Sequence, residues 1–172
     1  MTHFDLFNLL PSVDLDVAAL ETAHRKLAMA WHPDRAGAEP HARRLAAEKS
    51  AALNDAVKVL KDPVRRAFYV LELKGVKLDS DQAAAKVKMP MDFLEEIMEQ
   101  REALDALKAQ RKLEAAHAMA VDIREACNRT LAQAQAALRR DDVPVATTAL
   151  GRVRYYTRFL EEVDAFEEEL SS

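Results

Sequence analysis

Apolar residues recur at every third or fourth position along most of the chain, and this spacing is the feature that most restricts its fold. Such a period places apolar side chains on one face of an α-helix, whereas a half-buried strand requires strict alternation. The clearest stripe, within residues 111–140, consists of Leu113, Ala116, Ala120, Ile123, Cys127, Leu131, Ala134 and Leu138. The chain also contains 32 alanines and 21 leucines but only three glycines, a composition that favours helix. We therefore expect an all-α fold.

Local signals predict a helical hairpin in the first part of the chain. Asp16 suits the cap of a helix that ends near Trp31, because Pro33 lacks an amide hydrogen and keeps the residue before it out of the helical region. A second long helix is expected over residues 41–61, with Leu45 on its apolar face. The two helices are expected to pack antiparallel.

Shorter elements flank this hairpin. Residues 4–10 predict a brief N-terminal helix, and Asp62-Pro63 suits the cap and first residue of a helix over 63–74. Gly75 suits the position just past a helix end, and residues 76–90 have the turn residues and weak periodicity of a connection. The expected division is a domain over 1–75, a connection over 76–90 and a second domain over 91–172.

The second domain reads as three amphipathic helices joined by short turns. The first covers 91–108 and the second 111–140, and the third starts after Asp142 and Pro144. The expected core residues of the third helix are Val153, Tyr156, Leu160, Val163 and Leu170. This pattern predicts a three-helix bundle.

Charge and cysteine content exclude several functional classes. The net charge of −4 divides into +1 over residues 1–75 and −5 over 76–172, so neither part has the basic excess of a nucleic-acid-binding protein. The single cysteine, Cys127, makes neither an internal disulfide nor a four-ligand zinc site. No stretch approaches the ~20 apolar residues that span a membrane, and no basic or long apolar leader opens the chain. We expect a cytoplasmic protein that binds neither nucleic acid nor a membrane.

The most informative motif is His32-Pro33-Asp34, at the tip of the expected hairpin. It follows a helix that carries Arg25 and Lys26, and Arg35 comes directly after it. Proline stiffens the loop, so docking would cost little conformational entropy, and the three cations would steer the domain towards an acidic surface. Motif and context resemble the J-domain of DnaJ-type co-chaperones over about residues 1–75.

The second half of the chain also resembles a known family. Residues 89–107, MPMDFLEEIMEQREALDAL, are similar to the opening of the C-terminal domain of HscB, the co-chaperone of iron–sulfur cluster assembly. The resemblance then covers essentially the whole chain. It implies that the J-domain stimulates the ATPase of HscA, a DnaK-type chaperone, and that the bundle binds the scaffold IscU. The chain itself would be an activator rather than an enzyme.

The resemblance also selects residues for each partner. Docking on the chaperone would use His32, Pro33, Asp34, Arg25, Lys26 and Arg35. Docking on the scaffold would use Leu94, Met98, Glu99, Glu102 and Tyr155.

Leu94, Met98 and Glu102 share one helix face at i, i+4 and i+8, beside the stripe expected to face the bundle. The alternative is that Leu94 and Met98 only widen the buried stripe and that Tyr155 packs at the domain junction. Glu95 departs from the apolar residue common in the family, which would move the patch towards Met98 and Ile97.

Other functions stay open for the tripeptide. It could simply end a helix within a purely structural module, or belong to a J-domain adaptor for an unrelated client. An enzyme could use His32 as a base and Asp34 to orient it, but no serine or cysteine nucleophile accompanies them in a recognisable motif. Pro33 is also expected to prevent a simple mutual hydrogen bond between them.

Neither a metal nor a cofactor is expected. His24, His32 and His41 are too widely spaced for one helical turn and have no cysteine companions. Cys127 belongs to a regular apolar stripe, where a free cysteine acts as a small hydrophobe, and cluster ligation needs several thiolates. The iron–sulfur cluster would therefore belong to the partner.

Overall fold

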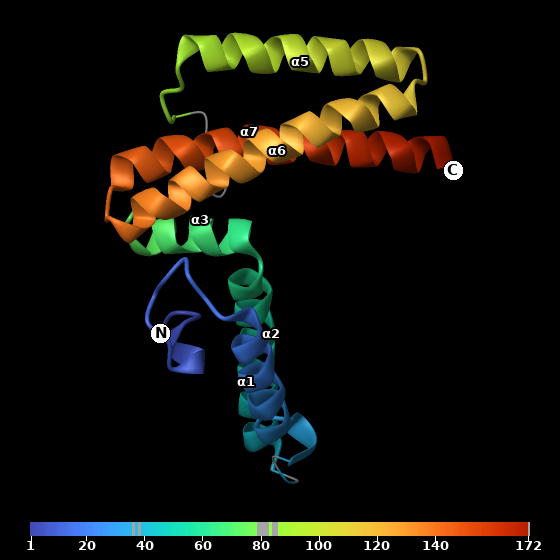
Figure 1. Cartoon of the computed structure of the whole chain (residues 1–172). Coiled ribbons are helices and arrows are strands. Elements are labelled where there is room, and N and C mark those ends of the chain that lie inside the picture. Colours follow the sequence, from blue (N-terminus) through green and yellow to red (C-terminus); the bar gives the residue numbers. More distant parts are fainter. Residues whose placement is uncertain (36, 38, 79–82, 84–85, 172) are drawn as a thin grey trace. The chain divides into compact units, whose positions relative to one another are not determined.

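The computed structural model describes residues 1–35, 37, 39–78, 83 and 86–171, and every regular element in these ranges is helical (Figure 1). The predicted all-α class is confirmed. The elements are η1 (Asp5–Phe7), α1 (Val17–Ala30), η2 (Pro33–Arg35), α2 (Pro40–Lys61), α3 (Pro63–Leu73), α5 (Met91–Ala109), α6 (Leu113–Arg139) and α7 (Val143–Ser171), where η denotes a 3-10 helix. Contacts between Cα atoms divide the chain into two compact units, Met1–Val70 and Leu71–Ser172.

Helices α1 and α2 form the expected antiparallel hairpin in the first unit (Figure 1). The Asp16 carboxylate caps α1 by accepting the Ala19 N–H at 3.0 Å, and α1 ends at Ala30 as Pro33 requires. The fully buried side chains of the hairpin are Leu20, Leu53, Ala56 and Leu60. Leu45 was expected on the apolar face but is exposed, because α1 has 14 residues and α2 has 22, so α1 does not cover the first turns of α2.

The N-terminal segment is tied to the end of the hairpin by Arg66. This buried arginine donates from Nε to the Val13 carbonyl at 2.9 Å and from Nη1 to the Leu60 carbonyl at 2.5 Å. The helix expected over 4–10 is reduced to η1, because Asn8 adopts a left-handed conformation (φ +54°) that ends it. Phe4 is fully buried and stacks on Tyr69.

Helix α3 starts and stops where the sequence predicts. The Asp62 carboxylate accepts the N–H groups of Val64 and Arg65 at 2.8 and 2.9 Å, and Gly75 follows the helix with φ +93°. The contact boundary between the units falls within α3. The exact limits of the predicted connection remain a prediction, and its residues 79–82 and 84–85 lie outside the described ranges.

The described parts of that connection are packed within the second unit. Leu78 and Met89 are buried, and the Leu78 carbonyl accepts a hydrogen bond from Arg154 of α7 at 3.3 Å. Gly151 lies inside α7, where a Cβ atom would overlap the Met89 methyl group. The chain entering α5 is therefore held against α7.

Helices α5, α6 and α7 form the predicted bundle, with α6 and α7 side by side along most of their length (Figure 1). In α7 the core includes Phe159 and Phe166, whereas Leu160 and Leu170, which were expected inside, are half-buried. Positions 159 and 160 both lie near the buried stripe, and the larger aromatic side chain occupies the inner place. No helix in the described ranges is both long and apolar enough to cross a membrane.

Candidate functional site

The His-Pro-Asp tripeptide lies in the loop that joins α1 to α2, where η2 turns the chain. The Asp34 N–H donates to His32 Nδ1 at 3.2 Å, and the Asp34 Oδ2 atom lies 3.5 Å from the same nitrogen. Pro33 was expected to prevent a mutual hydrogen bond between the two side chains. The tight turn of η2 brings the imidazole and the carboxylate to an ion-pair distance, and the hydrogen bond that His32 Nδ1 accepts comes from the Asp34 backbone. Both side chains remain exposed, at 56% for His32 and 89% for Asp34. The loop presents a preformed polar pair to solvent.

Arg35 folds back onto the end of α1. Its Nη1 donates to the Met29 carbonyl at 3.2 Å, and its backbone N–H donates to the His32 carbonyl at 2.9 Å. A cation near the last carbonyls of a helix interacts favourably with the helix dipole. Arg35 therefore also stabilises the conformation of the loop.

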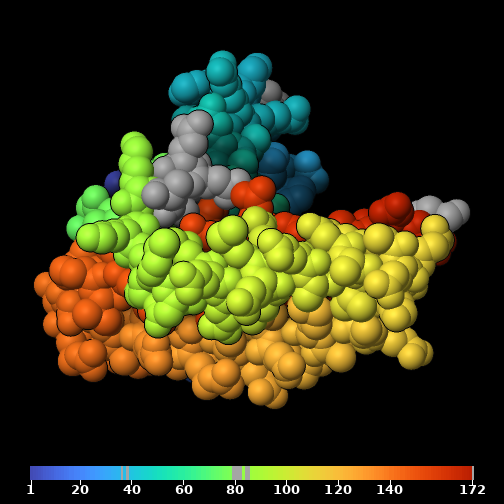
Figure 2. All heavy atoms as spheres, turned by 90° about the horizontal axis from the view of Figure 1, so that it is seen from above, coloured from blue at the N-terminus to red at the C-terminus, as the bar shows by residue number. Residues whose placement is uncertain are grey.

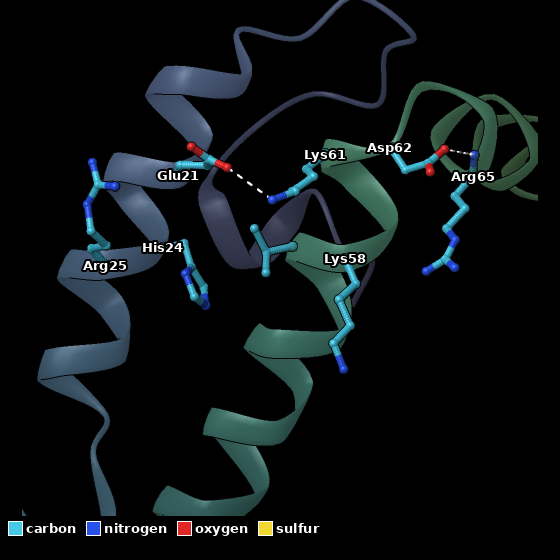
Figure 3. A pocket seen from close by; sticks show the side chains of 8 residues that line it. Glu21, His24, Arg25, Lys58, Lys61, Asp62 and Arg65 are labelled. Carbon is cyan, nitrogen blue, oxygen red and sulfur yellow. Dashed lines mark hydrogen bonds and ion pairs between the residues drawn. The ribbon is translucent and has the colours of Figure 1, made fainter. Parts of the chain in front are cut away.

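Arg25 and Lys26 are exposed on α1, before the tripeptide. His24 and Lys61 reach into the space between α1 and α2, and Arg25 lies on α1 at the edge of this space (Figure 3). This space is a cavity of about 510 Å³ lined by Glu21, His24, Arg25, Val57, Lys58, Lys61, Asp62 and Arg65. Glu21 pairs with Lys61 at 3.2 Å across it. Cations outnumber acids here, which suits an acidic partner surface.

Sequence reasoning missed a contact that steadies the tip of the hairpin. The Nζ of Lys49 on α2 lies 5.9 Å from the ring centroid of Trp31, at the end of α1. A cation over an indole face is an attractive arrangement that fixes both side chains. Nothing in the local sequence could have predicted it, because the two residues meet only when the hairpin closes.

Helix α5 faces the viewer in Figure 2, and the predicted scaffold-binding residues on this helix are exposed or half-buried. Met98 is 63% exposed, Glu99 and Glu102 are exposed, and Leu94 is half-buried. Phe93 and Ile97 are buried, as expected for the stripe that faces the bundle. The expected shift of the patch towards Ile97 is therefore wrong, because the burial of Ile97 leaves it no surface for a partner, whereas Met98 is exposed. The helix therefore carries apolar surface beyond what its own core contacts use. The alternative in which Met98 widens the buried stripe does not fit its exposure.

Tyr155 reaches the same end of α5 from α7. Its half-buried ring meets Phe93 edge-on, with 5.7 Å between the centroids, and Tyr156 meets Phe93 in the same way at 5.7 Å. Because Phe93 directly precedes Leu94, the structure brings Tyr155 next to the start of the predicted face. Tyr155 thus contributes both to packing and to the half-exposed surface.

Met91 is an exposed residue that the prediction omitted. Its side chain is 71% exposed, and it precedes Leu94 by three positions and Met98 by seven. This spacing places the three residues on one helix face, so the sequence contained the signal. We call Met91, Leu94 and Met98, together with Glu99, Glu102 and Tyr155, the α5 face.

Two ion pairs hold the far part of α5 against α7. Arg101 Nη2 lies 2.7 Å from Glu162 Oε1, and Lys108 Nζ lies 3.7 Å from Glu162 Oε2. One carboxylate therefore receives two cations of α5. Together with Phe93 at the other end, this clamp sets which side of α5 faces outward.

The other histidine and cysteine side chains considered as possible catalytic or metal-binding groups make contacts within the fold. His24 Nε2 lies 3.0 Å from the Asn54 side-chain oxygen, and His117 Nε2 lies 3.2 Å from Glu167. Cys127 is buried in the α6 stripe, and burial raises the pKa of its thiol. Within the described ranges, no three His, Cys, Asp or Glu side chains gather in a metal-binding group.

Comparisons with known proteins cover both units. A DnaJ domain model matches residues 2–69, and a model described as HSCB C-terminal oligomerisation domain matches 89–164. The chain is 41% identical over 109 residues to the co-chaperone protein HscB homolog of Shewanella halifaxensis, an alignment that spans 63% of this chain and 61% of that protein. It is 33% identical over 172 residues to the homolog of Aeromonas hydrophila, covering 99% and 98% of the two chains. The solved structure of chaperone HscB from Vibrio cholerae is similar at a TM-score of 0.80 and 31% identity, over 99% of each chain.

Proposed function

This chain belongs to the HscB family of co-chaperones, and we propose that it delivers an IscU-like iron–sulfur scaffold to an HscA-like DnaK-type chaperone and stimulates the ATPase of that chaperone. The observation that carries the proposal is that two compact units of one chain each expose a group of residues suited to docking. The first is the His32-Pro33-Asp34 loop, and the second is the α5 face. The domains responsible are residues 1–75 and 91–172, and the expected site of action is the cytoplasm.

The loop is suited to dock on the chaperone. Asp34 is almost fully exposed and lies beside an imidazole, so its carboxylate can meet an arginine of the partner with little rearrangement. Arg25 and Lys26 steer the approach. If docking favours the chaperone conformation that hydrolyses ATP, the co-chaperone raises the rate through a shift of population. This chain then needs no catalytic residue of its own.

The α5 face is suited to bind a folded client. Exposed methionines adapt to the shape of a partner, and half-exposed aromatic side chains such as Tyr155 are common centres of binding energy. Glu99 and Glu102 border the apolar residues, so basic residues of the scaffold would set its orientation. The exposed Glu95 lies four positions after Met91, on the same helix face, so its charge borders the apolar residues there and the patch is centred on Met98.

Linking the two surfaces explains why modest affinities suffice. Once the scaffold is bound to α5, its encounter with the chaperone takes place at the high effective concentration that tethering creates. Separate variants test the two halves of the mechanism. Asp34→Asn should abolish ATPase stimulation and keep scaffold binding, whereas Leu94→Ala/Met98→Ala/Tyr155→Ala should do the reverse.

Purified IscU and HscA are the probes for this experiment. Met29→Ala is a matched control, because Met29 is 68% exposed but lies on the other unit. If the triple variant binds IscU as tightly as wild type, the α5 face is not the client site. If wild type stimulates HscA but does not bind IscU, the chain is a J-domain adaptor for a different client.

A further inference from the structure

A groove between α6 and α7 opens beside the α5 face. Its volume is about 350 Å³, and its lining residues are Gln133, Pro144, Val145, Thr148, Ala149 and Arg152. Val145 is 48% exposed at its wall. The groove is thus mainly apolar. Its one cation is Arg152, which precedes Tyr155 by three positions on α7.

Arg152 connects this groove to the aromatic cluster under the α5 face. Its guanidinium carbon lies 5.0 Å from the ring centroid of Phe93, the same ring that meets Tyr155. Val145, Thr148, Arg152 and Tyr155 follow one another at i, i+3, i+7 and i+10 along α7, which places them on one helix face. The groove therefore adjoins Tyr155, the residue that α7 contributes to the α5 face.

The hydrogen-bonding capacity of Arg152 is not fully used. Its Nε atom is buried and finds no acceptor among the residues that the structure describes. A buried donor without a partner costs free energy, and a carboxylate matches the planar donors of a guanidinium better than a neutral group does. The buried Nε itself lies out of reach of a partner, so a partner carboxylate would meet the part of the half-buried Arg152 side chain that lines the groove.

We propose that the groove binds a segment of the scaffold in which an acidic residue lies next to an apolar one, the carboxylate pairing with Arg152 and the apolar side chain covering Val145. This inference rests on the proposed function, since the occupant is the same client that docks on the α5 face. It adds a cationic contact to a surface whose other charges, Glu99 and Glu102, are acidic. Opposite charges at the two ends of one surface specify a single orientation of the bound protein.

Substitutions at Thr148 test the carboxylate without removing Arg152 from Phe93. Thr148→Glu places a carboxylate four residues before Arg152, in position to pair with it within the helix and occupy the groove. Thr148→Gln has nearly the same size and no charge. We expect Thr148→Glu to weaken binding of purified IscU about tenfold relative to Thr148→Gln, measured by titration calorimetry with the full-length protein.

Arg152→Gln should weaken IscU binding by a similar factor. The difference in affinity between this variant and wild type should become smaller as the salt concentration rises. Arg158→Gln is the control, because Arg158 is an exposed arginine of the same helix outside the groove. The inference is overturned if Thr148→Glu and Thr148→Gln bind IscU equally, or if Arg152→Gln matches wild type while Leu94→Ala/Met98→Ala is weakened. Absence of IscU binding by wild type would instead overturn the proposed function, and this inference with it.

Discussion

The Nδ1 atom of His32 lies 3.5 Å from Oδ2 of Asp34, so the two polar residues of the tripeptide contact each other across the proline between them. Both are exposed, which means that their contact contributes little to folding. The loop nevertheless has a defined shape, because η2 and the Arg35 contact to Met29 support it. Function and stability should therefore separate cleanly at these positions.

For the tripeptide, we expect Asp34→Asn to remove most stimulation of HscA while the free energy of unfolding changes by less than about 0.5 kcal/mol. The reason is that an amide keeps the shape of the side chain but cannot pair with a cation. Asp55→Asn is the matched control, since Asp55 is an exposed aspartate of α2 away from the tip. Equal loss of stimulation in both variants would show that the effect is not specific to the loop.

Neighbouring residues of α5 should separate binding from stability. Ile97 is 4% exposed and Met98 is 63% exposed. We expect Ile97→Ala to lower the free energy of unfolding by about 2–5 kcal/mol, whereas Met98→Ala lowers it by less than about 0.5 kcal/mol but weakens IscU binding. Urea unfolding and calorimetry measure the two effects. A large loss of stability in Met98→Ala would contradict its placement outside the core.

Arg66 should be far more important for folding than its neighbour Arg65. Arg66→Ala leaves the buried carbonyl groups of Val13 and Leu60 without their donor, which we expect to cost about 2–4 kcal/mol in urea unfolding. Arg65→Ala serves as the control, because the Arg65 side chain is exposed and its backbone N–H keeps the bond to Asp62. Similar losses of stability in the two variants would show that the Arg66 hydrogen bonds to Val13 and Leu60 do not stabilise the fold.

The thiol of Cys127 should make stability depend on pH above neutrality. Burial raises its pKa, so on raising the pH the unfolded chain loses this proton before the folded chain does. The stabilising contribution is complete below the unfolded pKa of about 8.5 and is lost as pH rises towards the folded value. We expect the difference in unfolding free energy between wild type and Cys127→Ala to be constant between pH 6 and 8. Above that range, wild type should lose stability relative to Cys127→Ala. A difference that stays constant to pH 10 would contradict a buried thiol.

Much of the fold could be predicted because its signals are local. Asp16, Pro33 and Asp62-Pro63 mark helix ends through their own backbone and side-chain chemistry, and each does so in the structure. The burial of Phe159 in place of Leu160 could not be predicted. The two residues are adjacent on α7, and the packing of α7 against α6 decides which of them faces the core. Leu45 was misplaced for a similar reason, since only the hairpin shows where α1 stops covering α2.

The candidate site shows the same division. Exposure of Met98 and burial of Ile97 followed from spacing along α5, and Met91 could have been found in that way. The contacts of Arg152 with Phe93 and of Lys49 with Trp31 join residues 59 and 18 positions apart in the chain. Such pairs have no periodic signal, so only the folded structure identifies them.

The most direct test of the central claim is the steady-state ATPase rate of HscA with this protein, measured with and without IscU. Wild type should raise the rate alone and raise it further with IscU. Asp34→Asn should show neither effect, and Leu94→Ala/Met98→Ala/Tyr155→Ala should keep the first effect and lose the second. A rate that this protein does not change, or that Asp34→Asn raises as much as wild type does, would contradict the account.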